Sequence, residues 1–316
     1  MKTAGGGYDY QQQFSILRFI QLLNFTAMKS YYLILITIFL TSCDVVDVVP
    51  LINKNYAIVA PELEEKVEYD EQRNIFYGED ELQTYDIFLP KNQSSKVPVI
   101  ILLHGGGWSE GDKGFINPIV GYLKQKNVKC AIVNANYRLT YKSGITYKQQ
   151  IEDIDLIIKK LRNEAKSLNI TPKFFLMGIS AGGHLAMLYS YSADANKVVE
   201  VVGGIVTPSD LTSEKIRQGR MNTDIEKLIG KPFNEAPDEY RKASPAFQIR
   251  RTSPPTILFY GGSDNLVPAE QGSLMSARLK ELNIKHEYYL YPEQSHNWSL
   301  LNETLDKMIA FADKYL

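Results

Sequence analysis

The feature that most limits how this chain can fold is a series of short apolar runs separated by amphipathic segments. Val97–Leu103 reads Val-Pro-Val-Ile-Ile-Leu-Leu, and Val128–Asn134 is a second run of this kind. Such runs are typical of strands in a sheet that is covered on both faces. After them, Tyr147–Leu168 carries apolar residues every three or four positions, which predicts an amphipathic helix.

This alternation continues to the end of the chain. Repeated strand–helix units predict an α/β fold, with a mainly parallel central sheet and helices on both faces. Residues 209–251 interrupt the rhythm with charged residues and prolines, and we expect them to form a small lid insertion rather than a second domain. The further strands are expected at 74–78, 84–90, 173–178, 198–206, 256–260 and 286–291, and the further helices at 181–192, 269–282 and 300–315.

Residues 178–182 read Gly-Ile-Ser-Ala-Gly and fit the pattern G-x-S-x-G. A predicted strand precedes them and a predicted helix follows, which is the context in which such a turn exposes a nucleophilic serine. The helix N-terminus behind the turn also favours negative charge that develops there. The pattern therefore predicts Ser180 as a nucleophile, and the alternative is a glycine-rich turn without chemistry.

Three consecutive glycines follow the first apolar run directly, between His104 and Trp108. Without side chains, such a loop can direct its N–H groups into a cleft and leave room for a substrate carbonyl. We expect the N–H groups of Gly106, Gly107 and Ala181 to form an oxyanion hole, in which each donor contributes roughly 3–4 kcal/mol. A flexible loop is the alternative.

A base and an orienting carboxylate are needed to activate the serine. Asp264 and His296 each follow a predicted strand, and in the order Ser180, Asp264, His296 the nucleophile on a strand-to-helix turn comes first, then the acid and then the base, as is typical when such a turn carries the nucleophile. Asp210, after the strand at 198–206, is the alternative acid. The remaining histidines are expected to serve structure: His104, His184 and His286.

The chain resembles an α/β-hydrolase through five motifs, and the resemblance covers roughly residues 74–316. They are His-Gly-Gly-Gly-Trp at 104–108, Asn-Tyr-Arg-Leu at 136–139, Gly-Ile-Ser-Ala-Gly-Gly-His-Leu-Ala at 178–186, Gly-Gly-Ser-Asp at 261–264 and Ser-His at 295–296. The group it resembles most is the esterase and lipase branch similar to hormone-sensitive lipase and to bacterial acetyl-xylan and feruloyl esterases.

The resemblance implies a serine esterase that cleaves short-acyl esters of carbohydrates, acetyl or feruloyl, through an acyl-enzyme and without a cofactor. Trp108 and Trp298 are then candidates for lining the substrate site, with plain packing as the alternative. A formamidase or other amidase shares the glycine loop. A serine exopeptidase shares the serine turn but is expected to carry a partner domain, for which this length leaves no room. A non-catalytic binding module is the alternative of a different class, but such proteins typically lose the serine or the histidine.

Composition argues against several other classes of protein. The chain has 35 basic and 36 acidic residues, so its net charge of −1 does not predict a nucleic-acid-binding surface. Its two cysteines cannot form a disulfide framework, and its four histidines are not clustered as metal ligands. We expect Cys130 to be a buried thiol in a strand. Nothing in the sequence indicates an oligomeric state.

Residues 31–40 form the most apolar stretch, between Lys29 and the sequence Leu-Thr-Ser-Cys at 40–43. Ten residues span about 15 Å as a helix, half of a bilayer core, so the stretch predicts a signal peptide rather than a transmembrane anchor. The ending resembles the lipobox of bacterial lipoproteins, in which the cysteine, here Cys43, is lipidated and becomes the new N-terminus. A buried apolar element is the alternative.

The expected organisation is a signal peptide at 1–42, a lipidated tether at 43–60 and a hydrolase domain at 61–316. Met28-Lys29-Ser30 resembles a natural start, so residues 1–27 are interpreted as the product of an upstream start codon. These segments predict an exported lipoprotein that a lipid anchor holds to a membrane of the bacterial cell envelope.

Overall fold

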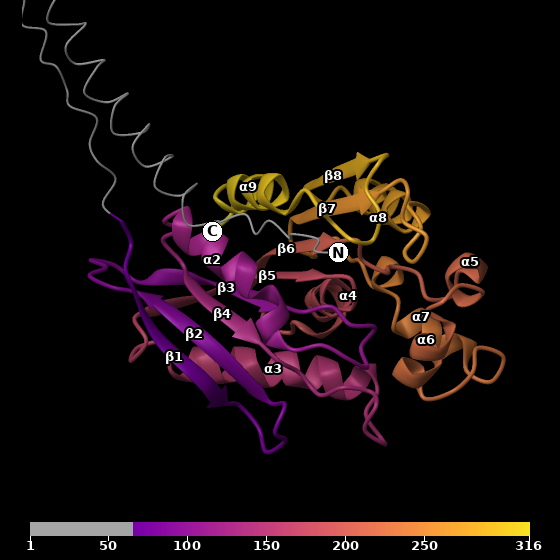
Figure 1. Ribbon diagram of the computed structural model, residues 1–316, viewed down its shortest axis with the longest axis horizontal. Coiled ribbons are helices and arrows are strands. Elements are labelled where there is room, and N and C mark those ends of the chain that lie inside the picture. The colour runs from indigo at the N-terminus through magenta and orange to yellow at the C-terminus, as the bar shows by residue number, and fades with distance from the viewer. Residues whose placement is uncertain (1–65) are drawn as a thin grey trace, which may run out of the picture. The chain divides into compact units, whose positions relative to one another are not determined.

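The computed structural model of the protein describes residues 66–316, which build an eight-stranded sheet with helices on both sides (Figure 1). The order across the sheet is β1-β2-β4-β3-β5-β6-β7-β8. β1 and β2 are antiparallel to their neighbours, and all pairs from β4 to β8 are parallel. The strands are β1 (Tyr69–Phe76), β2 (Thr84–Pro90), β3 (Val97–Leu103), β4 (Ala131–Ala135), β5 (Ile170–Ile179), β6 (Val199–Ile205), β7 (Thr256–Gly261) and β8 (His286–Tyr291). The predicted mainly parallel α/β sheet is therefore confirmed.

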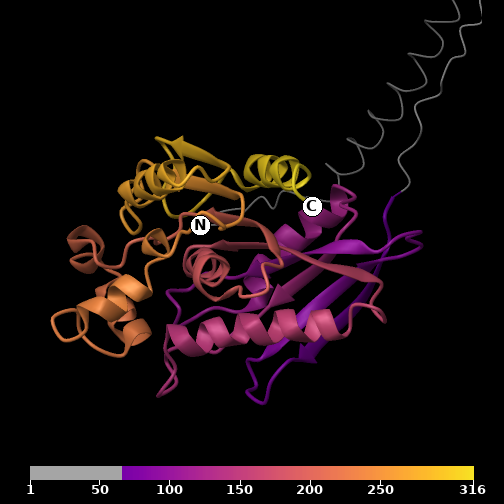
Figure 2. The same cartoon turned by 180° about the vertical axis from the view of Figure 1, so that it is seen from behind.

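Helices pack on both faces of this sheet because its central strands are apolar on both sides. The apolar faces of α2 (Asn117–Gln125) and α9 (Leu301–Ala312) share one core with side chains such as Ile100 and Phe259. The opposite face is covered by α3 (Tyr147–Asn163), α4 (Ala181–Leu188) and α8 (Glu270–Glu281). Figure 2 shows α3 lying in front of the sheet when the molecule is seen from behind.

The expected insertion contains three short helices that the sequence pattern did not predict individually. They are α5 (Glu214–Arg217), α6 (Asn222–Ile229) and α7 (Pro237–Lys242). The three lie together at one end of the domain in both views (Figures 1 and 2). Ile225, Leu228 and Tyr240 are fully buried and fix them to the main core.

The prediction that Cys130 is a buried thiol in a strand is wrong. Cys130 lies one residue before β4 and is only partly buried, so it is not a strand thiol. The preceding Lys129 is exposed, and the regular strand begins only at Ala131. Burial nevertheless raises the pKa of Cys130 to about 12, which keeps the side chain a neutral thiol.

The predicted signal peptide, the lipidation site Cys43 and the tether lie outside the described residues. Between residues 66 and 316, no helix has the length and apolar character needed to cross a bilayer.

Candidate active site

The register of the parallel strands brings the predicted motifs to one edge of the sheet. Leu103, the last residue of β3, pairs with Gly178 near the end of β5. Gly261, the last residue of β7, pairs with Tyr291 at the end of β8. The glycine loop, the serine turn and the loops that carry the predicted acid and base therefore all leave the sheet at its carboxyl edge, where α/β sheets bind their ligands.

The serine turn is strained in the way that its sequence predicts. Ser180 has φ 52° and ψ −119°, a backbone conformation that costs a non-glycine residue about 1–3 kcal/mol. A Cβ on Gly178 would collide with the backbone of Gly182, and a Cβ on Gly182 would collide with the carbonyl of Leu103. Both glycines are thus required for the sharp turn between β5 and α4. The Ser180 N–H donates to the carbonyl of Ile205 at 2.8 Å, which fixes the turn to β6.

The structure brings Ser180, His296 and Asp264 together in one hydrogen-bonded chain. His296 Nδ1 lies 2.8 Å from Asp264 Oδ2, and His296 Nε2 lies 3.1 Å from Ser180 Oγ. The carboxylate of Asp264 is fully buried, and its Oδ1 accepts hydrogen bonds from the N–H groups of Leu266 and Val267 at 2.8 Å each. These bonds orient the carboxylate toward the imidazole, so the Nδ1–H tautomer leaves Nε2 free to accept the serine proton.

Asp210, the alternative acid, is engaged elsewhere. Its Oδ1 accepts hydrogen bonds from the N–H and the hydroxyl of Thr212, at 2.8 and 2.6 Å, and so closes a local turn. Among the described hydrogen bonds, none joins Asp210 to His296. The geometry therefore favours Asp264 as the carboxylate that orients the base.

The glycine loop lies beside the serine with unused donors. Gly106 and Gly107 have φ of 122° and 56°, and a Cβ on Gly105 would lie 3.4 Å from the Cβ of Ser180. Within residues 66–316, the N–H groups of Gly106, Gly107 and Ala181 donate to no protein acceptor. Three donors next to a nucleophile are what an oxyanion hole needs.

His104 holds this loop in place from behind. Its Nδ1 lies 2.7 Å from the carbonyl of Gly105, and its ring stacks on Tyr137 with the centroids 4.4 Å apart. Burial lowers the pKa of His104, so the ring is neutral and donates from Nδ1. The C=O and N–H of a trans peptide point in opposite directions, so this bond turns the N–H of Gly106 away from His104.

Trp108 does not line the substrate site, which corrects that prediction. Its side chain is fully buried, and its Nε1–H donates to His184 Nδ1 at 3.0 Å. His184 Nε2 in turn donates to the carbonyl of Ala243 at 2.8 Å, so the chain ties the glycine loop to α4 and to the insertion. Trp298 is partly buried and donates to Thr304 Oγ1 at 2.9 Å, beside the loop that carries His296. Local sequence gave no signal that Trp108 packs inward, because the contact with His184 spans 76 residues.

The buried His184 predicts a loss of stability in acid. Burial lowers the pKa of His184 from 6.5 to about 4 in the folded protein. Between these values the unfolded chain binds a proton that the folded chain does not, so the free energy of unfolding falls as the pH drops from about 6.5 to about 4. A shift of this size is worth ~3 kcal/mol at the acid end. Urea unfolding at pH 7 and pH 4.5 should show a smaller acid loss for His184→Gln than for the wild type, and equal losses would contradict the assignment.

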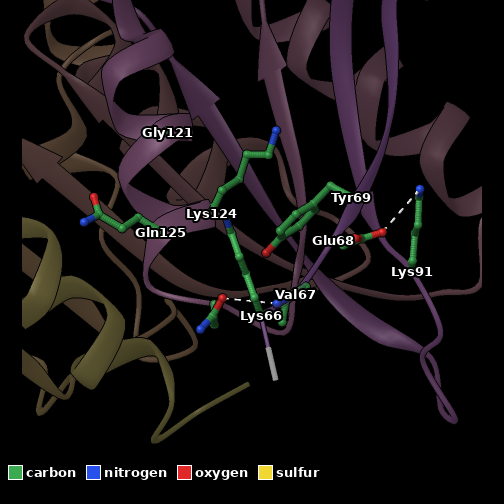
Figure 3. Close-up of a pocket in the computed structure, with 9 residues that line it drawn as sticks. Lys66, Val67, Glu68, Tyr69, Lys91, Gly121, Lys124 and Gln125 are labelled. Atoms are coloured by element: carbon green, nitrogen blue, oxygen red, sulfur yellow. Dashed lines mark hydrogen bonds and ion pairs between the residues drawn. The ribbon is translucent and has the colours of Figure 1, made fainter. Parts of the chain in front are cut away.

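A concave feature lies away from Ser180 and His296, at the edge of the sheet where β1 begins and β2 ends. It is a groove of about 740 Å³ whose lining includes Tyr69, Lys91, Gly121 and Lys124 (Figure 3). Lys91 forms an ion pair with Glu68, and Lys124 forms one with Glu71. The lining holds no pair of a nucleophile and a base, so the groove is not the candidate active site. Nor do the described residues include any cluster of three or more His, Cys, Asp or Glu side chains suited to a metal ion.

Comparison with known proteins agrees with this geometry. The chain is 25% identical over 251 residues to Esterase LipC of Mycobacterium tuberculosis and 24% identical over 253 residues to the isoprenylcysteine alpha-carbonyl methylesterase ICME of Arabidopsis thaliana. Both alignments cover 74% of this chain, but only 61% and 58% of those relatives, so the chain spans about 60% of their length. A solved structure described as a truncated form of a carbohydrate esterase from gut microbiota superposes with a TM-score of 0.71 at 22% identity, covering 79% of this chain and 97% of that one.

The structural match establishes the fold as that of an α/β-hydrolase, as the five motifs implied. The sequence profile of one family, BD-FAE, matches residues 85–279, which is more than half of the chain and includes both the glycine loop and the serine turn. By its sequence, the chain belongs to the BD-FAE family.

Proposed function

We propose that the chain is a serine hydrolase that cleaves carboxylic esters through an acyl-enzyme. The observation that carries the proposal is the hydrogen-bonded chain from Ser180 through His296 to Asp264, next to a loop with unused N–H donors. The names of the two relatives, an esterase and a methylesterase, point in the same direction.

Each group in the site has one role in the proposed reaction. Ser180 Oγ attacks the ester carbonyl while His296 Nε2 takes its proton, and the N–H groups of the glycine loop and of Ala181 stabilise the resulting oxyanion. The oxyanion collapses, the C–O bond to the alcohol breaks, and His296 returns the proton to the departing oxygen. Water then repeats the sequence on the acyl-enzyme, which releases the carboxylic acid and restores Ser180.

The substrates that we propose are short-acyl esters, acetyl or feruloyl, of carbohydrates. Support comes from the structural similarity to a carbohydrate esterase and from the motifs shared with carbohydrate esterases. A panel of p-nitrophenyl acetate, p-nitrophenyl octanoate, acetylated xylan and methyl ferulate tests the proposal. We expect kcat/KM to be at least about tenfold higher for the acetate than for the octanoate, together with acetate or ferulate release from the natural esters. A preference for octanoate would refute the short-acyl assignment, and no turnover of any ester would refute the activity.

We also propose that the protein is exported and anchored to a membrane through a lipid on Cys43. The proposal depends on the short apolar stretch and on the Leu-Thr-Ser-Cys sequence that ends it. We expect Cys43→Ala to move the protein from the membrane fraction to the soluble fraction after expression in a bacterial host with the lipoprotein pathway. An unchanged distribution between the two fractions would be incompatible with the anchor.

A further inference from the structure

Asp224 places a carboxylate against the glycine loop, although it comes from the insertion. It lies in the first turn of α6, and its Oδ2 is 3.1 Å from the point that a Cβ of Gly107 would occupy. Its Oδ1 is 3.4 Å from Ser109 Oγ, at the limit of a hydrogen bond. The fully buried Ile225 and Leu228 fix α6 to the core, so the position of the carboxylate beside the loop is set by a packed helix.

The carboxylate of Asp224 accepts fewer hydrogen bonds than that of Asp264, which accepts three. Within residues 66–316 the only side-chain hydrogen bond of Asp224 is the long one to Ser109, and it takes part in no ion pair. Two lysines of the insertion are paired with other acids, Lys215 with Glu270 and Lys242 with Glu239, and in the described part of the chain Lys227, three positions further along α6, forms no ion pair with Asp224. Asp224 is also partly exposed to solvent.

A free negative charge at this place opposes the proposed chemistry. The loop beside it has to stabilise a developing oxyanion, and two like charges repel each other. The repulsion is offset when the carboxylate binds a hydrogen-bond donor that the substrate itself brings. An ionised carboxylate can only accept hydrogen bonds, so the matching substrate group must carry an O–H or N–H donor, such as a hydroxyl or an ammonium.

We propose that Asp224 is a specificity-determining residue, which accepts a hydrogen bond from a free hydroxyl beside the ester in the alcohol portion of the substrate. The inference rests on the proposed function. An acetyl group has no donor, so for an acetyl ester the donor must belong to the alcohol. Carbohydrate alcohols carry hydroxyls on the carbons next to the ester, whereas simple alkyl and aryl esters do not. Asp224 thereby selects polyhydroxylated alcohols.

The test compares Asp224→Ala and Asp224→Asn on a methyl xyloside monoacetate with free hydroxyls, on its O-methylated counterpart, and on p-nitrophenyl acetate. A hydrogen bond to a charged group predicts a roughly 10- to 100-fold fall in kcat/KM for the free-hydroxyl ester when Asp224 becomes alanine. Asparagine keeps one acceptor oxygen, so its loss should be smaller. Turnover of p-nitrophenyl acetate should instead rise about two- to fivefold in both variants, because the repulsion is removed.

Glu226→Gln is the matched control, since Glu226 lies on the same helix and pairs with Asn222 at 3.2 Å instead of facing the loop. It should leave all three rates unchanged. An equal fall on the free-hydroxyl and O-methylated esters would overturn the inference and make Asp224 a structural residue. The p-nitrophenyl ester of glycine, which bears an ammonium, is measured as a fourth substrate. A loss of turnover confined to this ester would overturn the inference in favour of an ammonium site. Absence of p-nitrophenyl acetate turnover in the wild type would instead refute the proposed function.

Discussion

Replacing Ser180 with alanine is expected to lower kcat for p-nitrophenyl acetate by ~10³-fold or more. Among residues 66–316, the variant removes the only hydroxyl in hydrogen-bonding contact with His296 Nε2, so the base has no nucleophile to activate. A residual rate is expected because the N–H donors of the glycine loop can still polarise the ester carbonyl. The fold should be retained, because the backbone bond from residue 180 to Ile205 does not depend on the side chain.

A fluorophosphonate probe separates the loss of the nucleophile from a loss of folding. The wild type should gain the mass of one phosphonyl group, and Ser180→Ala should gain none at an unchanged thermal midpoint. Ser192→Ala is the matched control, because Ser192 Oγ only caps the carbonyl of Leu188 beyond the end of α4, and it should keep full activity. Full activity in Ser180→Ala would rule out Ser180 as the nucleophile.

The main elements and the site were predictable because the signals that define them are local. Continuous apolar runs such as Val97–Leu103 identify buried strands, and the first and last residues of this run are those of β3 itself. The serine turn was predictable for the same reason. A serine with glycines two positions on either side, between a strand and a helix, is typical of a turn that exposes a nucleophile. Because parallel strands end at one edge, the order of the motifs in the chain was enough to predict that Asp264 and His296 would approach Ser180.

The features that the sequence did not predict depend on contacts between distant residues. α5, α6 and α7 are too short to show a clear period of 3.6 residues, and they form because side chains such as Ile225 are buried against the main core. The position of Asp224 beside Gly107 follows from that packing, and its sequence neighbours carry no sign of it. The sequence makes Trp108 a candidate for lining the substrate site because it follows the glycine loop, with plain packing as the alternative. In the structure Trp108 has a backbone φ of 62°, and its side chain lies in the core, where it donates a hydrogen bond to His184.

Asp264→Asn is expected to reduce kcat by roughly 10³-fold or more while KM changes little. The N–H groups of Leu266 and Val267 both point at Oδ1 of Asp264, so the carbonyl oxygen of an asparagine should take that side. Its NH₂ group then faces His296 Nδ1, which can only accept a hydrogen bond from it. The imidazole is thereby driven into the Nε2–H tautomer, which donates to Ser180 and cannot take its proton.

Asp210→Asn separates this explanation from a general effect of removing a charge near the site. Asp210 binds Thr212 and closes a turn, so its replacement should lower kcat less than about fivefold. Both variants should fold, and their kcat values for p-nitrophenyl acetate decide between the two acids. A severe loss in Asp210→Asn together with a mild one in Asp264→Asn would mean that the carboxylate 2.8 Å from His296 is not the one that orients it during turnover.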